Sequence, residues 1–459
     1  MKKVELEKYA DLFSEYTELR VQENRALNVS IVNGSVMSNS SSAKGGVSAR
    51  SFSGGLWGFA SSPLLSDSSI KQVIESATSN AKFLSKKEKR DFHPLPSRPG
   101  RVFRDFSTKK NRMSQKELIG FLMDLDSRIE SKYSDVVSRT ISLRLLDMEK
   151  SLVTSDGSVA RTMIPRSIIY VILSTERDGE PVQLGDVHGG LGQFEDVFSK
   201  PSEYYSNLEE HYTELKKKAE GVHPETGLKD CILDAKLAGI LSHEAIGHTT
   251  EADIVRGGSV AGDRLGRQVA SPLVTLVDFA GEALGETCPV PVYMDDEGTL
   301  AEDAVLIQEG VLKGFLHNKE SSDFFDARPT GNARAYRFSD EPIIRMRNTA
   351  ILPGDSSLEE MIASVDDGYY LIRPSNGQAD STSEFMFGIT QGYEIKNGKL
   401  GRAIKDTTIS GVAFDMLKTV SAVSRDMNWS CSGMCGKKQP IPVGMGGPAV
   451  KCKMNIGGR

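Results

Sequence analysis

The sequence predicts an α+β protein: an N-terminal α/β region of β-hairpins and helices, followed by a strand-rich C-terminal domain. Three observations lead to this fold class. Glycine turns separate short segments in which apolar and polar residues alternate, which is typical of strands. Helical periodicity recurs at a few separate places along the chain. The length of 459 residues exceeds what one hydrophobic core usually organises, so two or three domains are expected.

The first part of the chain is expected to begin with a short amphipathic helix at 5–19 and to continue in strands. The pair Asn33-Gly34 predicts a tight hairpin, because both residues tolerate positive φ. A second strand pair is expected around Gly54-Gly55. Helical periodicity follows at 69–86.

A stretch at 93–100 contains three prolines and a glycine, so it is a candidate linker and a possible sub-boundary within the N-terminal region. A helix at 115–132 is expected next, with Ser114 as its N-cap. Strands are then expected from 135 to 189, with a hairpin at Asp156-Gly157.

The main domain boundary is placed after a polar helix at 202–219. Gly221 and Pro224 end that helix. The N-terminal region therefore spans 1–222 and the C-terminal domain spans 223–459.

The C-terminal domain is expected to contain few helices. A strongly apolar helix is predicted at 231–250 and a later one at 411–425. The remainder consists of short strand-like segments separated by glycine turns, of which Asn397-Gly398 is typical.

Composition and charge exclude several classes of protein. A net charge of −6 and a pI near 5.8 argue against a surface that neutralises nucleic-acid phosphates. The N-terminus lacks the apolar core of a signal peptide, and no apolar run approaches the roughly 20 residues of a membrane span. Five cysteines, an odd number, do not suggest a disulfide framework. We therefore expect a cytoplasmic protein that neither binds DNA directly nor enters a membrane.

The segment 237–248 of the helix predicted at 231–250 carries three ionisable side chains, His243, Glu244 and His248. Burying them is unfavourable unless a partner compensates, and a metal ion would do so. The histidines are five residues apart, which separates them by about 140° on a regular helix. A local π-bulge, with Gly247 supplying backbone freedom, would bring both to one ion. The alternative is that local hydrogen bonds satisfy the two imidazoles.

This segment resembles the H-E-x-x-x-H signature of the TldD branch of the TldD/PmbA family of metallopeptidases. The resemblance covers nearly the whole chain. The segment 435–444 is similar to the family's C-G-K-x-G-Q-x-V-P-V-G element, although it is about one residue shorter and lacks the glycine before Gln439. Further similar segments lie at 46–52, 58–60, 331–335, 345–349 and 353–355.

The resemblance implies a zinc-dependent peptidase. His243 and His248 would be zinc ligands, and Cys435 would be the third protein ligand. Two neutral imidazoles and one thiolate leave a fourth tetrahedral position for water. That metal-bound water would be the nucleophile, with Glu244 as the catalytic carboxylate and general base.

Other residues near these motifs have more than one interpretation. Cys431 is a rival ligand or a resolving thiol. Glu251 and Asp253 are alternative ligands, although orienting an imidazole through its free N–H is the expected role of Glu251. The remaining cysteines are expected to be small core residues: Cys231, Cys288 and Cys452.

Two arginines and a histidine complete the set of candidate residues. Arg334 and Arg345 are either ligands for a peptide carboxylate or structural ion-pair partners, and sequence spacing leaves both roles open. His188, beside a glycine pair, is expected to be a turn residue.

The family implies unfolded or extended peptides as substrates, which a strand-rich domain would hold by main-chain hydrogen bonds. It also implies a dimer, either a homodimer or a heterodimer with a PmbA-like subunit that lacks the motif. Two alternative functions remain: a non-catalytic peptide-binding partner subunit, and a modulator of DNA gyrase that acts through peptide processing.

Overall fold

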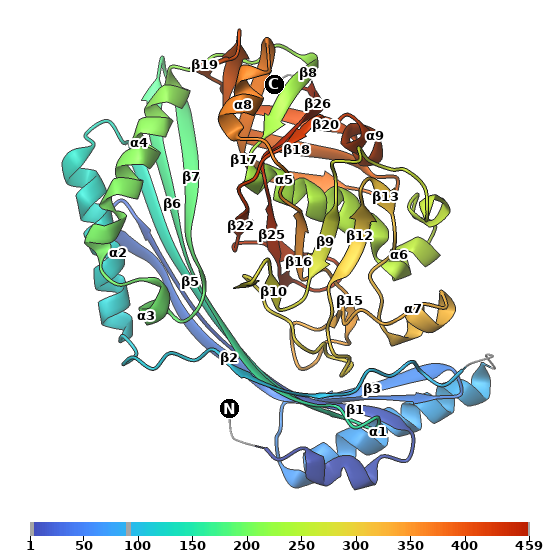
Figure 1. Ribbon diagram of the computed structural model, residues 1–459. Coiled ribbons are helices and arrows are strands. Elements are labelled where there is room, and N and C mark those ends of the chain that lie inside the picture. Colours follow the sequence, from blue (N-terminus) through green and yellow to red (C-terminus); the bar gives the residue numbers. More distant parts are fainter. Residues whose placement is uncertain (1–3, 89–92, 458–459) are drawn as a thin grey trace.

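The computed structural model describes residues 4–88 and 93–457. Its N-terminal region is built on one curved seven-stranded sheet in the order β3-β2-β1-β5-β6-β4, with β7 paired to β6. The sheet curves around the C-terminal region, which lies on its concave side, while helices lie on the outer side (Figure 1). The strands are β1 (Tyr16–Val32), β2 (Ser35–Ser53), β3 (Leu56–Ser62), β4 (Arg101–Asp105), β5 (Ser138–Thr154), β6 (Val159–Arg177) and β7 (Glu180–Leu191).

Two hydrophobic clusters attach helices to this sheet. One cluster joins α1 (Asp67–Lys87) to β1 and β2 through residues such as Ile70 and Leu19. The other joins α2 (Gln115–Lys132) and α4 (Tyr205–Ala219) to β5 and β6. Shorter helical segments are η1 (Glu7–Leu12), α3 (Phe194–Val197) and η2 (Pro201–Tyr204).

Several local predictions for the N-terminal region are confirmed. Asn33 and Gly34 form the β1–β2 turn, with φ of 47° and 77°. Gly54-Gly55 joins β2 to β3, and Asp156-Gly157 joins β5 to β6. Ser114 caps α2 in a capping box. The helix predicted at 69–86 corresponds to α1, and the polar helix at 202–219 corresponds to η2 and α4.

The helix predicted at 5–19 is wrong. Only the short η1 forms, and β1 begins at Tyr16. Residues 16–32 instead pair with β2 on one side and β5 on the other, which satisfies their backbone groups across the sheet. Residues 93–100 have no regular secondary structure and connect α1 to β4. The boundaries proposed at 93–100 and at 222/223 stay predictions.

The C-terminal region contains a closed barrel of strands. The strand order is β17-β8-β26-β20-β18-β19, and β17 also pairs with β18, so five of these strands form a ring. Residues such as Cys231 and Leu233 point into its large hydrophobic core. The strands are β8 (Gly227–Leu233), β17 (Asp367–Ala379), β18 (Glu384–Lys396), β19 (Lys399–Ala403), β20 (Thr407–Val412), β21 (Ala422–Val423) and β26 (Val450–Ile456).

A six-stranded sheet lies beside the barrel, in the order β13-β12-β9-β16-β25-β22. It consists of β9 (Leu276–Phe279), β12 (Ala304–Gln308), β13 (Val311–Leu312), β16 (Asn348–Ile351), β22 (Asn428–Ser430) and β25 (Gly444–Gly447). Three two-stranded pairs add β10 (Glu282–Ala283) with β11 (Glu286–Thr287), β14 (Ala333–Arg334) with β15 (Ile343–Ile344), and β23 (Met434–Cys435) with β24 (Ile441–Pro442). The longer fully α-helical segments are α5 (Ala235–Leu241), α6 (Ala252–Arg256), α7 (Lys319–Phe324), α8 (Leu358–Ala363) and α9 (Ala413–Lys418).

The expected α+β class and the strand-rich C-terminal region are confirmed, but two helix predictions are too long. The helix predicted at 231–250 starts only at Ala235, because residues before it belong to β8. The helix predicted at 411–425 is limited to α9. The Asn397-Gly398 turn is confirmed between β18 and β19. No helix among residues 4–88 and 93–457 is long and apolar enough to cross a membrane.

A buried network of charged side chains joins the N-terminal sheet to the C-terminal region. Arg50 pairs with Glu18 at 2.9 Å and with Glu297 of the C-terminal region. Lys319, which is fully buried, pairs with Asp156 at 2.6 Å. Removing one partner of such a pair usually costs about 3–5 kcal/mol, because the other charge stays buried. The network therefore helps to fix how the sheet sits against the C-terminal region.

Candidate metal centre

Helix α5 leads directly into the segment that carries the two histidines. This segment is a π-helix over Ser242–Gly247, followed by a 3-10 helix over His248–Thr250. The π-bulge predicted from the histidine spacing is therefore confirmed. The wider turn places the two imidazole rings on one side, with their centroids 5.3 Å apart.

Gly247 has a role different from the predicted one. Its φ of −56° and ψ of −51° are ordinary helical angles, so the expectation that it supplies special backbone freedom is wrong. A Cβ atom at this position would lie 1.9 Å from the sulfur of Met346, which is fully buried. Close packing against Met346 is therefore the reason for a glycine here.

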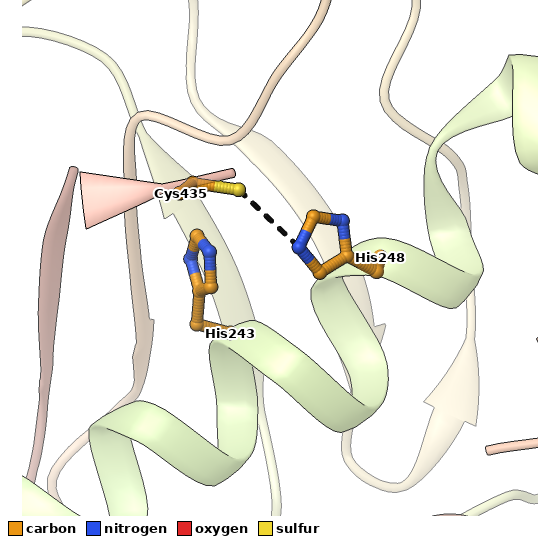
Figure 2. A group of neighbouring side chains, drawn as sticks. All are labelled: His243, His248 and Cys435. Atoms are coloured by element: carbon orange, nitrogen blue, oxygen red, sulfur yellow. Dashed lines mark hydrogen bonds between the residues drawn. The ribbon is translucent and has the colours of Figure 1, made fainter. Parts of the chain in front are cut away.

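The structure brings together the three predicted metal ligands. Figure 2 shows His243 and His248 on the helix, with Cys435 on the strand that approaches them. One possible ligand atom from each residue lies within 4.8 Å of the others. His243 and Cys435 are buried, with 0% and 2% of their surface exposed. The three side chains could therefore share one ion.

The two histidines differ in their hydrogen bonds. His248 has Nδ1 at 2.8 Å from Oε2 of Glu251 and Nε2 at 3.3 Å from Sγ of Cys435. Both ring nitrogens of His243 are buried and have no hydrogen-bond partner within the described part of the chain. Local hydrogen bonding thus does not satisfy His243, whereas a metal ion would take its lone pair. Two imidazoles and one thiolate are a donor set that suits zinc.

Electrostatic interactions favour a cation among these side chains. Burial disfavours the Cys435 thiolate, but the imidazoles of His243 and His248 lower its pKa to about 3. Burial also disfavours a charged His248, yet its contacts with Cys435 and Glu251 raise its pKa to about 10. A proton therefore occupies His248 in the absence of metal, and a metal ion would displace it.

Glu251 supports His248 from behind. Its carboxylate is fully buried, and Oε2 lies 3.2 Å from Nζ of Lys437 as well as 2.8 Å from the imidazole. This contact agrees with the orienting role predicted for Glu251. Asp253, the other carboxylate considered as a ligand, pairs with Lys437 at 2.8 Å and is not part of the three-residue cluster.

Glu244 lies beside the cluster of ligand atoms. Its Oε2 is 3.7 Å from Nε2 of His248, and 30% of its side chain is exposed. The carboxylate is thus close to the ligand atoms and accessible to a bound substrate. Such a position suits a group that accepts and returns a proton.

Buried arginines hold the loop that carries Cys435. Arg345 donates to the carbonyl oxygens of Cys435, Lys437 and Gln439 at 2.7, 3.0 and 2.6 Å. Arg334 likewise donates to two backbone carbonyls, at 2.6 and 2.9 Å. Both arginines bind backbone carbonyls and form no ion pair with another described residue, so the structural ion-pair role is wrong, while the role as ligands for a peptide carboxylate stays a prediction. Both arginines lie in segments that resemble motifs of the family, but the sequence does not show that backbone carbonyls are their hydrogen-bond acceptors.

Cys431 and His188 lie away from the three ligands. The Cys431 thiol donates to the carbonyl of Gly189 at 2.8 Å, and burial raises its pKa. His188 belongs to β7, where it pairs with Ile169, so its predicted turn position is wrong. Three further cysteines are buried, as predicted: Cys231, Cys288 and Cys452.

The sequence matches two domains of one family. Residues 226–458 match the PmbA/TldA metallopeptidase C-terminal domain, and residues 17–81 match the PmbA/TldA metallopeptidase domain 1. The first of these matches contains His243, His248 and Cys435. The family match therefore includes the whole candidate metal centre.

Curated relatives and solved structures agree with these domain matches. A metalloprotease of Methanocaldococcus jannaschii is 31% identical over 95% of this chain and 96% of its own length. A zinc metalloprotease TldD homologue of Saccharolobus solfataricus is 29% identical over 88% of this chain and 87% of its own length. TldE from Thermococcus kodakarensis has the same fold, with a TM-score of 0.76, 17% identity and 98% coverage of both chains. A proposed modulator of a DNA gyrase from Thermotoga maritima has a TM-score of 0.78 and 21% identity, and the match covers 99% of this chain and 98% of that one. This chain therefore belongs to the TldD/PmbA family of metallopeptidases.

Proposed function

We propose that the protein is a zinc-dependent peptidase in which His243, His248 and Cys435 hold the metal. The observation that carries this proposal is His243. Its two ring nitrogens are buried without a hydrogen-bond partner in the described residues, and the imidazole lies beside two other good zinc ligands. A bound zinc ion would polarise the scissile carbonyl and make an attacking water more acidic.

The protein's own side chains would orient the ligands and move the proton. Glu251 accepts a hydrogen bond from Nδ1–H of His248, which leaves Nε2 directed toward Cys435. Glu244 would accept a proton from the attacking water at its carboxylate and return it to the leaving amine. Its partial exposure, 30% of the side chain, allows contact with both groups. Amide-bond hydrolysis is therefore the proposed reaction.

We propose unfolded or extended peptides as substrates. Strand β22 lies at one edge of the six-stranded sheet and pairs with β25 on its inner side. It ends at Ser430, five residues before Cys435. An extended peptide can add to such an edge through main-chain hydrogen bonds, which select for extended backbone more than for particular side chains. The edge thus supports low sequence selectivity.

We further propose that the protein works as a dimer in the cytoplasm, with itself or with a PmbA-like subunit. The support for a partner is the exposed half of β2. Val36 and Met37 are 45% and 68% exposed, and β3 pairs only with residues 47–53 of this strand. The edge at 35–46 carries one charged side chain, Lys44, so most of its length is suited to pairing with another chain. The cytoplasm would keep Cys435 reduced. Light scattering of the purified protein, alone and mixed with a PmbA-like chain, measures the assembly.

Zinc content and peptide hydrolysis together test the proposed function. Glu244→Gln is expected to keep about one zinc per chain and to lose turnover by about 10²–10⁴-fold, because only the proton-transfer group changes. His243→Ala is expected to lose both zinc and activity. Glu320→Gln, a surface carboxylate that pairs with Arg256, is the matched control and should behave as wild type.

Full activity of Glu244→Gln would contradict the role of this carboxylate. Wild-type protein that contains no zinc and cleaves no unstructured peptide after zinc is added would favour a non-catalytic peptide-binding subunit.

A further inference from the structure

A second feature near Cys435 is a cavity of about 490 Å³ between the concave face of the N-terminal sheet and the C-terminal region. Strands β1, β2, β5 and β6 supply one wall. Tyr336, Ser432 and Met434 supply the other. Met434 directly precedes Cys435 on β23, so the cavity borders the strand that carries this ligand.

The charged residues that line this cavity are all of one sign. Arg144 on β5 and Arg166 on β6 contribute two guanidinium groups, and no aspartate or glutamate is among the lining residues. Arg144 lies on the exposed side of β5, with its guanidinium 4.9 Å from the centre of the Tyr170 ring. Neither arginine forms an ion pair with any residue in the described ranges 4–88 and 93–457. The cavity therefore carries uncompensated positive charge.

Arg166 is buried without a counter-ion, and it has fewer backbone acceptors than Arg334 and Arg345, the other buried arginines of the described chain that form no ion pair. Only 8% of its surface is exposed; both Nη atoms share the carbonyl oxygen of Gly433 at 3.2 Å, and Nε has no partner in the described chain. Arg139 of the same sheet is equally buried at 8%, but it pairs with Asp126 at 2.9 Å. Arg166 has neither such a carboxylate nor the two or three carbonyl acceptors of Arg334 and Arg345, so its charge is the least compensated of these buried arginines.

The surroundings of Arg166 confirm that its charge is poorly compensated. Burial lowers its pKa, and the groups that oppose this effect are the Cys431 thiol and the phenols of Tyr170 and Tyr336. None of these is a carboxylate, and each is neutral at physiological pH in its ordinary form. A carboxylate brought in by a ligand would therefore meet two guanidinium groups in the lining of one cavity: the exposed one of Arg144, and that of Arg166, whose Nη atoms share the Gly433 carbonyl.

We propose that this cavity binds a carboxylate of the peptide substrate, with Arg144 and Arg166 as its specificity-determining residues. The inference rests on the proposed peptidase function and names the class of peptide that the same site prefers. The carboxylate is either the free C-terminus of the peptide or an acidic side chain, since both present the same group to an arginine. Binding here holds the peptide beside the loop that carries Cys435.

The test measures binding of one unstructured, fluorescently labelled peptide in three forms. The first has a free C-terminus and no acidic side chain, the second is its C-terminal amide, and the third is the amide with one glutamate. Full-length protein carrying Glu244→Gln is used, so that the peptides stay intact. Fluorescence anisotropy then gives the Kd of each form.

The variant is Arg144→Gln, because Arg144 is exposed and its removal leaves the hold of Arg166 on Gly433 in place. The matched control is Arg104→Gln. Arg104 is also an exposed strand arginine, with its guanidinium 4.8 Å from the ring centre of Tyr293, but it does not line the cavity. Loss of a general arginine–tyrosine contact is thereby separated from loss of the cavity's charge.

One carboxylate form is expected to bind about tenfold more tightly than the plain amide, as a charge-assisted hydrogen bond would give. Arg144→Gln should reduce this ratio to about one to three, and Arg104→Gln should preserve it. The form that shows the preference identifies the source of the carboxylate. Equal binding of all forms, no binding of any, or an unchanged ratio in Arg144→Gln would overturn the proposal.

Hydrolysis of the same peptides by the protein with its native Glu244 is read separately. If the tenfold preference is found but no peptide is cleaved, the carboxylate site is supported and the peptidase function is refuted. Protein that cleaves all forms and binds them equally retains the peptidase and refutes the site.

Discussion

Replacing Gly247 with alanine would place a methyl group inside the side chain of Met346. The new Cβ would lie 1.9 Å from the Met346 sulfur, 3.1 Å from Cε and 3.2 Å from Cγ. Nonbonded heavy atoms of this kind normally approach to about 3.5–4.0 Å. The sulfur is in the middle of the side chain and Met346 is fully buried, so movement of the chain end alone cannot relieve the overlap.

Two opposing effects decide the size of the change in stability. Alanine favours a helix over glycine by up to about 1 kcal/mol. Overpacking a well-filled core costs typically about 1–3 kcal/mol. The steric effect is larger here because both neighbours of the sulfur are also in contact. We expect Gly247→Ala to lower the free energy of unfolding by about 1–2 kcal/mol and to displace His248, the next residue.

Thermal unfolding followed by circular dichroism measures this change against two references. Gly120→Ala lies within α2, where an added Cβ meets nothing within 4 Å, so it should be stabilising by up to about 1 kcal/mol. Gly247→Ala made in a Met346→Ala background should also become stabilising, because the overlapping atoms are gone. Equal destabilisation by Gly247→Ala in both backgrounds would refute the explanation.

Two further predictions concern buried ionisable groups. Glu251→Gln should reduce zinc affinity by about 10–100-fold in a chelator competition, because the carboxylate that orients His248 is replaced by a neutral amide. Glu320→Gln should leave zinc affinity unchanged. Equal zinc affinities of the two variants would contradict the orienting role of Glu251. Burial lowers the pKa of His317 from 6.5 to about 4. As the pH falls, the imidazole of His317 is therefore protonated in the unfolded chain before it is protonated in the folded one. The free energy of unfolding should consequently decrease by about 2 kcal/mol between pH 7 and pH 5. His317→Gln should remove that part of the acid sensitivity in urea unfolding, and an unchanged pH dependence would show that other groups cause it.

Local chemistry accounts for the parts of the fold that the sequence predicted well. The Asn33-Gly34 turn depends on two neighbouring residues that accept positive φ. The start of α2 depends on Ser114 and Glu117, which satisfy each other's backbone N–H groups. Such features need no information from distant parts of the chain. The same is true of the π-bulge, which followed from the spacing of His243 and His248.

The sequence-based predictions were wrong where pairing between strands far apart in the sequence decides the structure. The apolar residues Cys231 and Leu233 continue the pattern of α5 in sequence, but they form β8 between two other strands. Cys231 pairs with Tyr369 on one side and Cys452 on the other, far along the chain. No local pattern distinguishes such a strand from the first turn of a helix.

The candidate site shows the same division between local and distant information. Spacing suggested a metal at the two histidines, whereas Cys435 entered only through resemblance to a family. Its position depends on Arg345, whose carbonyl partner is 90 residues away in the sequence. Arg166 received no role from the sequence, because only the folded sheet shows that it lacks a counter-ion.

The separation in sequence between the histidine helix and Cys435 also determines when each proposed metal ligand is synthesised. Cys435 follows His248 by 187 residues, so a ribosome completes the histidine helix long before it adds the thiol. Strand β26, which pairs with β8, is synthesised later still. Every nascent chain shorter than 435 residues thus lacks one of the three proposed ligands.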